Sequence, residues 1–235
     1  MDDLHAITEA IRDLLADDGV YVLESSYMGD LLDNLIFDFI YHEHLTNFSV
    51  KPLDLFFKSK GLELIDLQRV PTKGGSMRYF VQRAGGPRRR KAIVDETLAS
   101  EKARGLHELA TYEAFGRRVD AAKAKVAGLL GELKAQGKTI AAYGASATST
   151  TFIYHFGLTG LLDFFVDDYR LKQNTYSPGC HIPVLPSSAL LEKKPDVCLI
   201  VAWRYAEPIM KKNADYLKQG GTFVIPLPEL KVVGR

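Results

Sequence analysis

The sequence predicts an α/β protein with two α/β units, and three observations indicate this fold class. An amphipathic helix pattern ends at Gly19 and is followed directly by an apolar strand candidate, residues 20–24. The region after Gly137 repeats the order strand, loop, helix, strand. Between them, residues 93–136 are rich in Ala, Glu, Lys and Leu and contain no proline, which predicts one long helix or two. We therefore expect a first domain over 1–92, a helical linker over 93–137 and a second domain over 138–235.

Within the first domain, apolar spacing predicts several further elements in order. They are a helix over 4–15, a packed helix over 31–45, an amphipathic helix over 49–60, and strands over 62–70 and 77–82. Residues 71–76 form the turn between the last two strands. Its Thr-x-Gly-Gly-Ser sequence exposes backbone N–H groups where no Cβ intrudes, so a ligand can approach closely. Hairpin turns also use Gly-Gly for purely conformational reasons.

The second domain follows the order of a Rossmann-like fold. Strands are predicted over 139–143, 162–166, 197–202 and 222–225, with helices over 187–193 and 206–219. The loop after the first strand carries one glycine, Gly144, where a dinucleotide-binding fingerprint has three, so an NAD site is not expected. Its hydroxyl residues at a helix N-terminus suit a phosphate or another anion. Small residues there also suit close packing of helix on strand, and the sequence leaves both readings open.

Composition limits the range of partners and compartments. The chain has 235 residues, 46% of them hydrophobic, and 30 basic against 29 acidic residues. This balance gives no broad field for nucleic acid or membrane. The basic run Arg88-Arg89-Arg90-Lys91 is typical of an exposed joint, and a phosphate-binding site is the less favoured interpretation. Two cysteines exclude a disulfide framework, and without an apolar span or signal sequence we expect a soluble, cytoplasmic protein.

Residues 37–44 hold the densest group of proton-transferring side chains. Tyr41-His42-Glu43-His44 places a phenol, a carboxylate and two imidazoles together beside apolar residues. In a helix, Tyr41 and His44 would share a face; in a strand, Tyr41 would pair with Glu43 and His42 with His44. A solvated turn after a helix is the alternative. A metal site at His42-x-His44 would need a third ligand, which the sequence does not supply nearby.

These motifs together resemble one family. The chain resembles the C-terminal portion of S-adenosylmethionine-dependent C-methyltransferases that act on nucleotide-linked keto-sugars. The matching segments, in family order, are Ile40-Tyr41-His42-Glu43-His44, Phe48-Ser49, residues 56–62, Pro71-Thr72-x-Gly74-Gly75-Ser76-x-Arg78, Ala142-Tyr143-Gly144-Ala145, Phe165-Val166-Asp167-Asp168 and Pro178-Gly179-x-His181-Ile182-Pro183.

The resemblance implies a fold and a mechanism. The fold is the end portion of a Rossmann-like methyltransferase sheet, followed by a second Rossmann-like α/β domain. A carbon next to a ketone loses a proton, and the carbanion attacks the methyl group of the sulfonium donor. Carried over, His44 is the catalytic base, with Tyr41 and Glu43 as hydrogen-bonding or orienting partners, and His42 is a packing or supporting residue. An imidazole with its ordinary pKa of about 6.5 is mostly neutral at pH 7, as a base must be.

The resemblance also implies the ligands. The acceptor, a nucleotide sugar, would be bound by two groups of residues: Thr72, Gly74, Gly75, Ser76 and Arg78 in the first domain, and Tyr143, Gly144, Ser146, Ser149 and Thr150 in the second. S-adenosylmethionine is the implied cofactor, and no metal is implied.

Two differences from the family leave the function open. The family's zinc-binding cysteine domain and its glycine-rich donor loop lie upstream of the matched segments, so we expect the chain to be incomplete alone and a separate N-terminal half to be its partner. Many relatives also carry Lys-Gly-Asn where this chain has Thr148-Ser149-Thr150. The alternative is a nucleotide-sugar or phosphate-binding module without catalysis.

Overall fold

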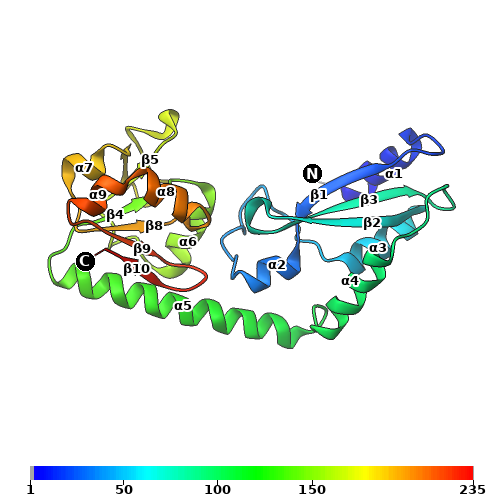
Figure 1. Ribbon diagram of the computed structural model, residues 1–235, viewed down its shortest axis with the longest axis horizontal. Coiled ribbons are helices and arrows are strands. Elements are labelled where there is room, and N and C mark those ends of the chain that lie inside the picture. Colours follow the sequence, from blue (N-terminus) through cyan, green and yellow to red (C-terminus); the bar gives the residue numbers. More distant parts are fainter. Residues whose placement is uncertain (1–2, 235) are drawn as a thin grey trace. The chain divides into compact units, whose positions relative to one another are not determined.

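The computed structural model describes residues 3–234 and divides the chain into two compact units (Figure 1). The first unit runs up to Asn34 and resumes over Thr46–Phe115. The second consists of Leu35–Leu45 and the chain from Gly116 onward. The short segment Leu35–Leu45 therefore interrupts the first unit in sequence and folds as part of the second.

The first unit is a three-stranded sheet with helices. Its elements are α1 (Leu4–Leu14), β1 (Tyr21–Ser26), α2 (Met28–Asp33), α3 (Val50–Ser59), β2 (Leu62–Val70), the 3₁₀ turn η1 (Thr72–Gly74), β3 (Ser76–Arg83), α4 (Ala92–Ala103) and the start of α5 (Leu109–Ala135). The strand order is β1-β3-β2, with β3 antiparallel to both neighbours. Tyr21 lies opposite Val81, and Leu62 opposite Arg83.

The core of the first unit lies between this sheet and α3 with α4. Alternate residues of β2 and β3, among them Leu64 and Tyr79, meet Leu53 and Phe57 of α3. α3 begins at Val50 because its first free N–H groups are capped from elsewhere in the unit. The buried Glu101 of α4 accepts hydrogen bonds from the amides of Val50 (2.6 Å) and Lys51 (3.1 Å) and from the Tyr27 hydroxyl (3.0 Å).

Most predicted elements of this unit are confirmed, but the helix predicted over 31–45 is wrong. α2 ends at Asp33, and Leu35 adopts a left-handed conformation with φ of 54°. The next residues, Leu35–Phe39, are all buried, although a helix on a surface buries only one stripe. The apolar run that suggested a helix is an irregular segment in which five consecutive side chains are buried.

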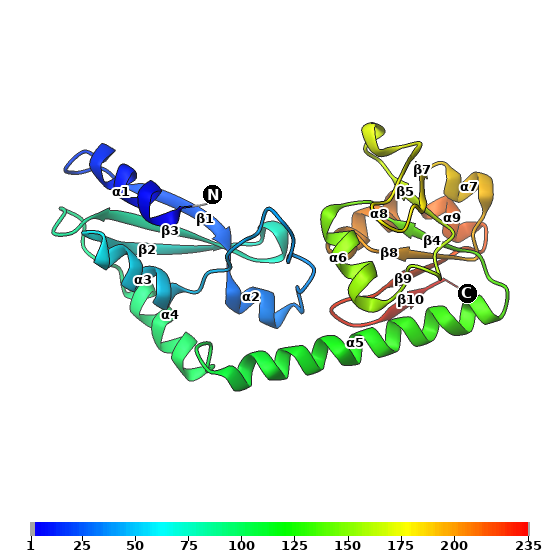
Figure 2. The same cartoon turned by 180° about the vertical axis from the view of Figure 1, so that it is seen from behind.

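The second unit is a seven-stranded sheet with helices on both faces. Its elements are the end of α5, β4 (Ile140–Tyr143), α6 (Ala147–Phe156), β5 (Phe164–Asp167), η2 (Arg170–Lys172), β6 (Thr175–Tyr176), β7 (Pro183–Pro186), α7 (Ala189–Lys193), β8 (Val197–Ile200), η3 (Trp203–Tyr205), α8 (Ala206–Lys212), α9 (Ala214–Lys218), β9 (Thr222–Ile225) and β10 (Lys231–Val233). The two opposite views in Figures 1 and 2 show α6 on one face of the sheet and α8 and α9 on the other.

The strand order fixes where a ligand crevice opens. The order is β10-β9-β8-β4-β5-β7-β6, in which β4, β5, β7, β8 and β9 are parallel and the two edge strands antiparallel. The chain first winds from β4 towards β5 and β7, and then crosses back to β8 and β9. The topological switch point therefore lies between β4 and β8, where open α/β sheets bind ligands at the carboxyl ends of their strands.

The predicted α/β class is confirmed, and the four predicted strands of the second unit are all found. Three further strands, β6, β7 and β10, were missed because they are only two to four residues long, and β7 is also bounded by prolines. The helix predicted over 206–219 is two helices that meet at Asn213. Within residues 3–234, every helix is too short or too polar to cross a bilayer.

Candidate functional site

The segment Leu35–Leu45 lies at the switch point of the second unit. On one side, the Phe37 ring stacks on Phe152 and Phe156 of α6, with centroids 5.8 and 5.0 Å away. The Thr151 hydroxyl of α6 donates a hydrogen bond to the Ile40 carbonyl oxygen (3.0 Å). α6 follows β4, so these contacts fix the segment to one border of the crevice.

Asp38 fixes the segment to the other border, at η3 after β8. The Asp38 side chain is fully buried, and both of its oxygens accept hydrogen bonds from Nη1 of Arg204, at 2.9 and 3.1 Å. The Trp203 indole N–H also donates to Asp38, at 3.2 Å. Burial raises the pKa of Asp38, and the hydrogen bonds and charge of Arg204 oppose that rise. A buried carboxylate held by three hydrogen bonds is a strong anchor for an irregular segment.

Tyr41 and His44 meet directly after this anchor. The amide of His44 donates to the Tyr41 carbonyl oxygen (2.9 Å), which closes a turn. Their rings meet edge to face, with centroids 4.9 Å apart, and the Phe39 ring contacts His44 in the same way at 5.1 Å. The i, i+3 pairing that the sequence predicted for a helix is thus made by a turn.

The four polar residues of the cluster have different surroundings. Tyr41 is half-buried, and burial together with the Glu43 charge raises the pKa of its phenol. The Glu43 carboxylate lies 3.9 Å from Nε2 of His42, and both side chains are exposed. Of the two roles expected for His42, the packing role is wrong, since 83% of its side chain is in solvent, and the supporting role stays a prediction. Among residues 3–234, no three His, Cys, Asp or Glu side chains gather as a metal site would need.

The first group of predicted acceptor residues forms the β2–β3 turn of the first unit. Thr72 donates to Glu24 (2.9 Å), Arg78 donates to the same carboxylate (2.7 Å), and the Ser76 hydroxyl donates to the Thr72 carbonyl oxygen (3.0 Å). The first two bonds tie the turn to β1, and the third lies within the turn.

The glycines of this turn have distinct conformational roles. The Gly74 carbonyl oxygen accepts a hydrogen bond from Asn34 (2.9 Å). Gly75 has φ of 136°, and a Cβ there would lie 2.3 Å from Cβ of Asp30. Only glycine lets the turn pass so close to α2.

The second group lies in the loop between β4 and α6. Ser146 caps α6 by accepting from the Ser149 amide, while the Ser149 hydroxyl accepts from the Ser146 amide, both at 3.3 Å. The Thr150 hydroxyl donates to the Ser146 carbonyl oxygen at 3.4 Å. Gly144 has φ of 101° and lies against Ala202, so the loop passes close to the loop after β8.

Tyr143 lies under this loop and is buried. Its hydroxyl donates to Asp168 (3.0 Å), and burial raises its pKa to about 12. The neighbouring acid, Asp167, accepts hydrogen bonds from the amides of Ala145 (2.7 Å) and Tyr169 (2.8 Å). The two acids at the end of β5 thus hold the end of β4 and the loop that follows it.

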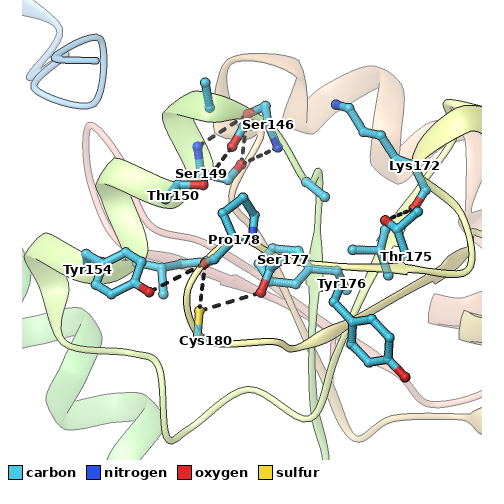
Figure 3. A pocket seen from close by; sticks show the side chains of 15 residues that line it. Ser146, Ser149, Thr150, Tyr154, Lys172, Thr175, Tyr176, Ser177, Pro178 and Cys180 are labelled. Carbon is cyan, nitrogen blue, oxygen red and sulfur yellow. Dashed lines mark hydrogen bonds between the residues drawn. The ribbon is translucent and has the colours of Figure 1, made fainter. Parts of the chain in front are cut away.

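Three predicted residues of this loop, Ser146, Ser149 and Thr150, line a cavity of about 410 Å³ (Figure 3). Lys172 lines it as a cation, and its Nζ lies 3.6 Å from Asp167. Figure 3 shows the three hydroxyl residues together, with Tyr154 to the left of the view and Lys172 to the right. The remaining lining includes Tyr176 and Cys180 from the excursion between β5 and β7. The site therefore offers a helix N-terminus, hydroxyls, a cation and aromatic rings.

Sequence reasoning missed the residues that come from far along the chain. Lys172 and Tyr176 lie in irregular or very short elements that carry no periodic signal. Asp38 and Arg204 stand 166 positions apart, and nothing local pairs them. The available signal for such a pair was Asp38 itself, an acid between two phenylalanines in an apolar run, because a buried charge requires a partner of opposite charge.

The basic run Arg88–Lys91 forms the connection between β3 and α4, as predicted. Arg90 donates to Asp54 (2.7 Å) and Asp95 (2.9 Å), and Lys91 donates to Asp66 (2.5 Å). Arg88 bonds the carbonyl oxygen of Asp18. These cations tie the segment before α4 to the first unit.

Comparison with known proteins assigns the chain to a family. Residues 71–228 match the family model described as the C-methyltransferase C-terminal domain. The chain is 34% identical over 232 residues to the C-methyltransferase NovU of Streptomyces niveus, a match that covers 98% of this chain and 55% of NovU. The chain thus spans about half the length of this curated relative. These matches confirm the resemblance seen in the sequence: the chain belongs to the family of the C-methyltransferase C-terminal domain.

Proposed function

We propose that this chain is the C-terminal part of an S-adenosylmethionine-dependent C-methyltransferase that acts next to the keto group of a nucleotide-linked sugar. The observation that carries the proposal is the meeting of Tyr41 and His44, ring against ring, on a segment anchored at the switch point of the second unit. The similarity to NovU, a C-methyltransferase by name, supports the reaction class.

The chemistry assigned to the cluster is proton removal from the carbon next to a ketone. His44 takes this proton through its imidazole, and the electrons move onto the ketone oxygen to give an enolate. Because burial and Glu43 raise its pKa, the Tyr41 phenol stays protonated and donates a hydrogen bond to that oxygen. Glu43, exposed beside His42, supplies negative charge near the imidazoles. General-base catalysis of this kind contributes roughly 10²–10⁴-fold.

The cavity beside α6 suits the nucleotide part of the acceptor. A volume of about 410 Å³ falls within the range of roughly 300–1,000 Å³ for small-molecule sites. Tyr154 and Tyr176 offer apolar rings for a base or a ribose, and Lys172 with the start of α6 offers positive potential for phosphate.

The residues of the second unit do not fit a methyl-donor site. In Rossmann-like folds an acid after a strand holds the ribose hydroxyls of the bound nucleoside. Here Asp167 is hydrogen-bonded to the amides of Ala145 and Tyr169, and Asp168 to Tyr143 (3.0 Å) and Lys212 (2.5 Å). Both acids are used within the fold, so we assign donor binding to a separate N-terminal half and derive no step through the donor.

The alternative is a nucleotide-sugar or phosphate-binding module without catalysis. It is favoured by the cavity itself, whose lining suits binding and does not include His44. The two functions differ in one measurable property, because only the enzyme labilises a proton of the acceptor.

Hydrogen–deuterium exchange of the acceptor tests the proposal without a methyl donor. The chain is incubated in D₂O with a nucleoside-diphosphate-linked keto-sugar, and NMR follows the proton next to the ketone. We expect exchange well above the buffer rate, and a loss of roughly 10²–10⁴-fold in His44→Ala, about 3–5 kcal/mol of barrier. The matched control His42→Ala, exposed and two positions away, should keep most of the rate.

Three outcomes would contradict the assignment. Binding without any exchange above the buffer rate would establish the binding module. Loss of exchange in His42→Ala but not in His44→Ala would mean that the base is the other histidine. Loss in neither variant would remove the cluster from catalysis.

A further inference from the structure

One buried ion pair holds the His44 segment on the second unit. Asp38 is fully buried and the Arg204 side chain is 11% exposed, so both charges are withdrawn from water. The sequence separation of 166 residues means that the pair exists only when Leu35–Leu45 is docked beside η3. Losing one partner would leave the other charge buried without compensation.

The guanidinium also packs on the aromatic ring that contacts the imidazole. Its central carbon lies 4.5 Å from the centroid of the Phe39 ring and 4.8 Å from that of Trp203. Phe39 also contacts the rings of His44 and Tyr41, with the centroids 5.1 and 6.3 Å away. The Phe39 ring thus contacts both Arg204 and His44, and together with Tyr41 it packs against the imidazole.

Arginine suits this place for reasons that lysine does not meet. Its planar group donates to both oxygens of Asp38 and at the same time offers flat faces to Phe39 and Trp203. A lysine ammonium is a point charge that can pair with the carboxylate but cannot stack.

We propose that Arg204 is a positioning residue: by holding Asp38 and Phe39 it docks the Leu35–Leu45 segment and fixes the imidazole of His44 at the switch point. The docking part of this inference stands on the contacts alone. The catalytic part rests on the proposed function, and the experiment separates the two.

The docking part is tested by amide hydrogen exchange of the full chain, read by mass spectrometry on peptides that cover residues 35–45. Arg204→Gln leaves the Asp38 charge buried alone, so exchange in these peptides should accelerate roughly 100-fold or more. Asp38→Asn in the Arg204→Gln background removes that charge, and the double variant should recover much of the protection. Unchanged exchange in Arg204→Gln, or no recovery in the double variant, would overturn the docking role.

The catalytic part uses proton exchange of the keto-sugar nucleotide. Arg204→Gln should lower the exchange rate at saturating acceptor while the dissociation constant for the nucleoside diphosphate stays unchanged. Arg204→Lys, which keeps the charge but loses the stacking, should retain docking better than it retains the rate. The matched control is Arg90→Gln, which breaks the pair with the buried Asp54 in the first unit.

Each result has one reading. If Arg204→Gln slows proton exchange no more than Arg90→Gln does, Arg204 has only a structural role. If the wild-type chain exchanges no acceptor proton, the proposed function fails, and the amide exchange of residues 35–45 still decides whether Arg204 docks the segment.

Discussion

Lys172 brings a positive charge to a cavity otherwise lined by hydroxyl, aromatic and apolar groups. Its side chain is 39% exposed, and its Nζ forms an ion pair with Asp167 at 3.6 Å, which is too far for a hydrogen bond and leaves the N–H donors of the ammonium for a phosphate. The Asp167 carboxylate is meanwhile satisfied by backbone amides. Because the backbone amides already bind the Asp167 carboxylate, its negative charge is partly offset, and an anionic ligand can still bind near Lys172.

We therefore expect Lys172→Ala to weaken binding of a nucleoside diphosphate about tenfold, close to 1.4 kcal/mol, because one charge-assisted hydrogen bond is lost. Isothermal titration calorimetry at two salt concentrations measures the effect, which should shrink at high salt. The control is Lys138→Ala, which breaks an exposed pair with Asp196 before β4. Equal affinities for the two variants would remove Lys172 from the site.

At the scale of elements, the junction of β4 with α6 depends on a close approach of two loops. Gly144 has φ of 101°, and a Cβ at this position would lie 2.6 Å from Cβ of Ala202 in the loop after β8. These two loops border the switch point, so their spacing also determines how η3 presents Arg204.

Gly144→Ala should consequently destabilise the second unit by about 2–4 kcal/mol, the sum of left-handed strain and overpacking. Gly157→Ala separates the two contributions, because Gly157 also has positive φ (70°) but a Cβ added there would meet open space. We expect about 1–2 kcal/mol for that variant. Thermal melts followed by circular dichroism compare the variants, and equal shifts in Tm would mean that the contact with Ala202 contributes nothing.

The elements that could be predicted from the sequence are those whose burial is periodic or continuous. β4, β5 and β8 are buried at every position, as central parallel strands are, and each was found by its apolar run. The same signal led to the wrong helix prediction over 31–45, because a continuous apolar run does not distinguish a buried irregular segment from a buried helix. The two-residue strand β6 and the proline-bounded β7 carry no pattern long enough to detect.

At the scale of the whole molecule, the chain leaves the first unit after Asn34 and returns to it at Thr46. The proton-transferring side chains of the intervening cluster, such as Tyr41 and His44, can be recognised from the sequence, and their catalytic role stays a prediction. The sequence could not predict the surface that the cluster packs against, since that surface belongs to α6 and η3, more than a hundred residues later in the chain. Long-range pairing is a property of the fold, and local patterns do not encode it.

The last prediction concerns the methyl donor, because we assign acceptor binding to this chain and donor binding to another half. The chain by itself should bind S-adenosylmethionine weakly or not at all, with a dissociation constant above about 1 mM, weaker than about −4 kcal/mol. The physical reason is that Asp167 and Asp168, the acids at the usual nucleoside position, already hold the loop after β4 and Lys212. Isothermal titration calorimetry measures the affinity, and a nucleoside-diphosphate sugar serves as the positive control on the same sample. A micromolar constant for S-adenosylmethionine, about −8 kcal/mol, would place a donor site within this chain and contradict the assignment of that site to another half.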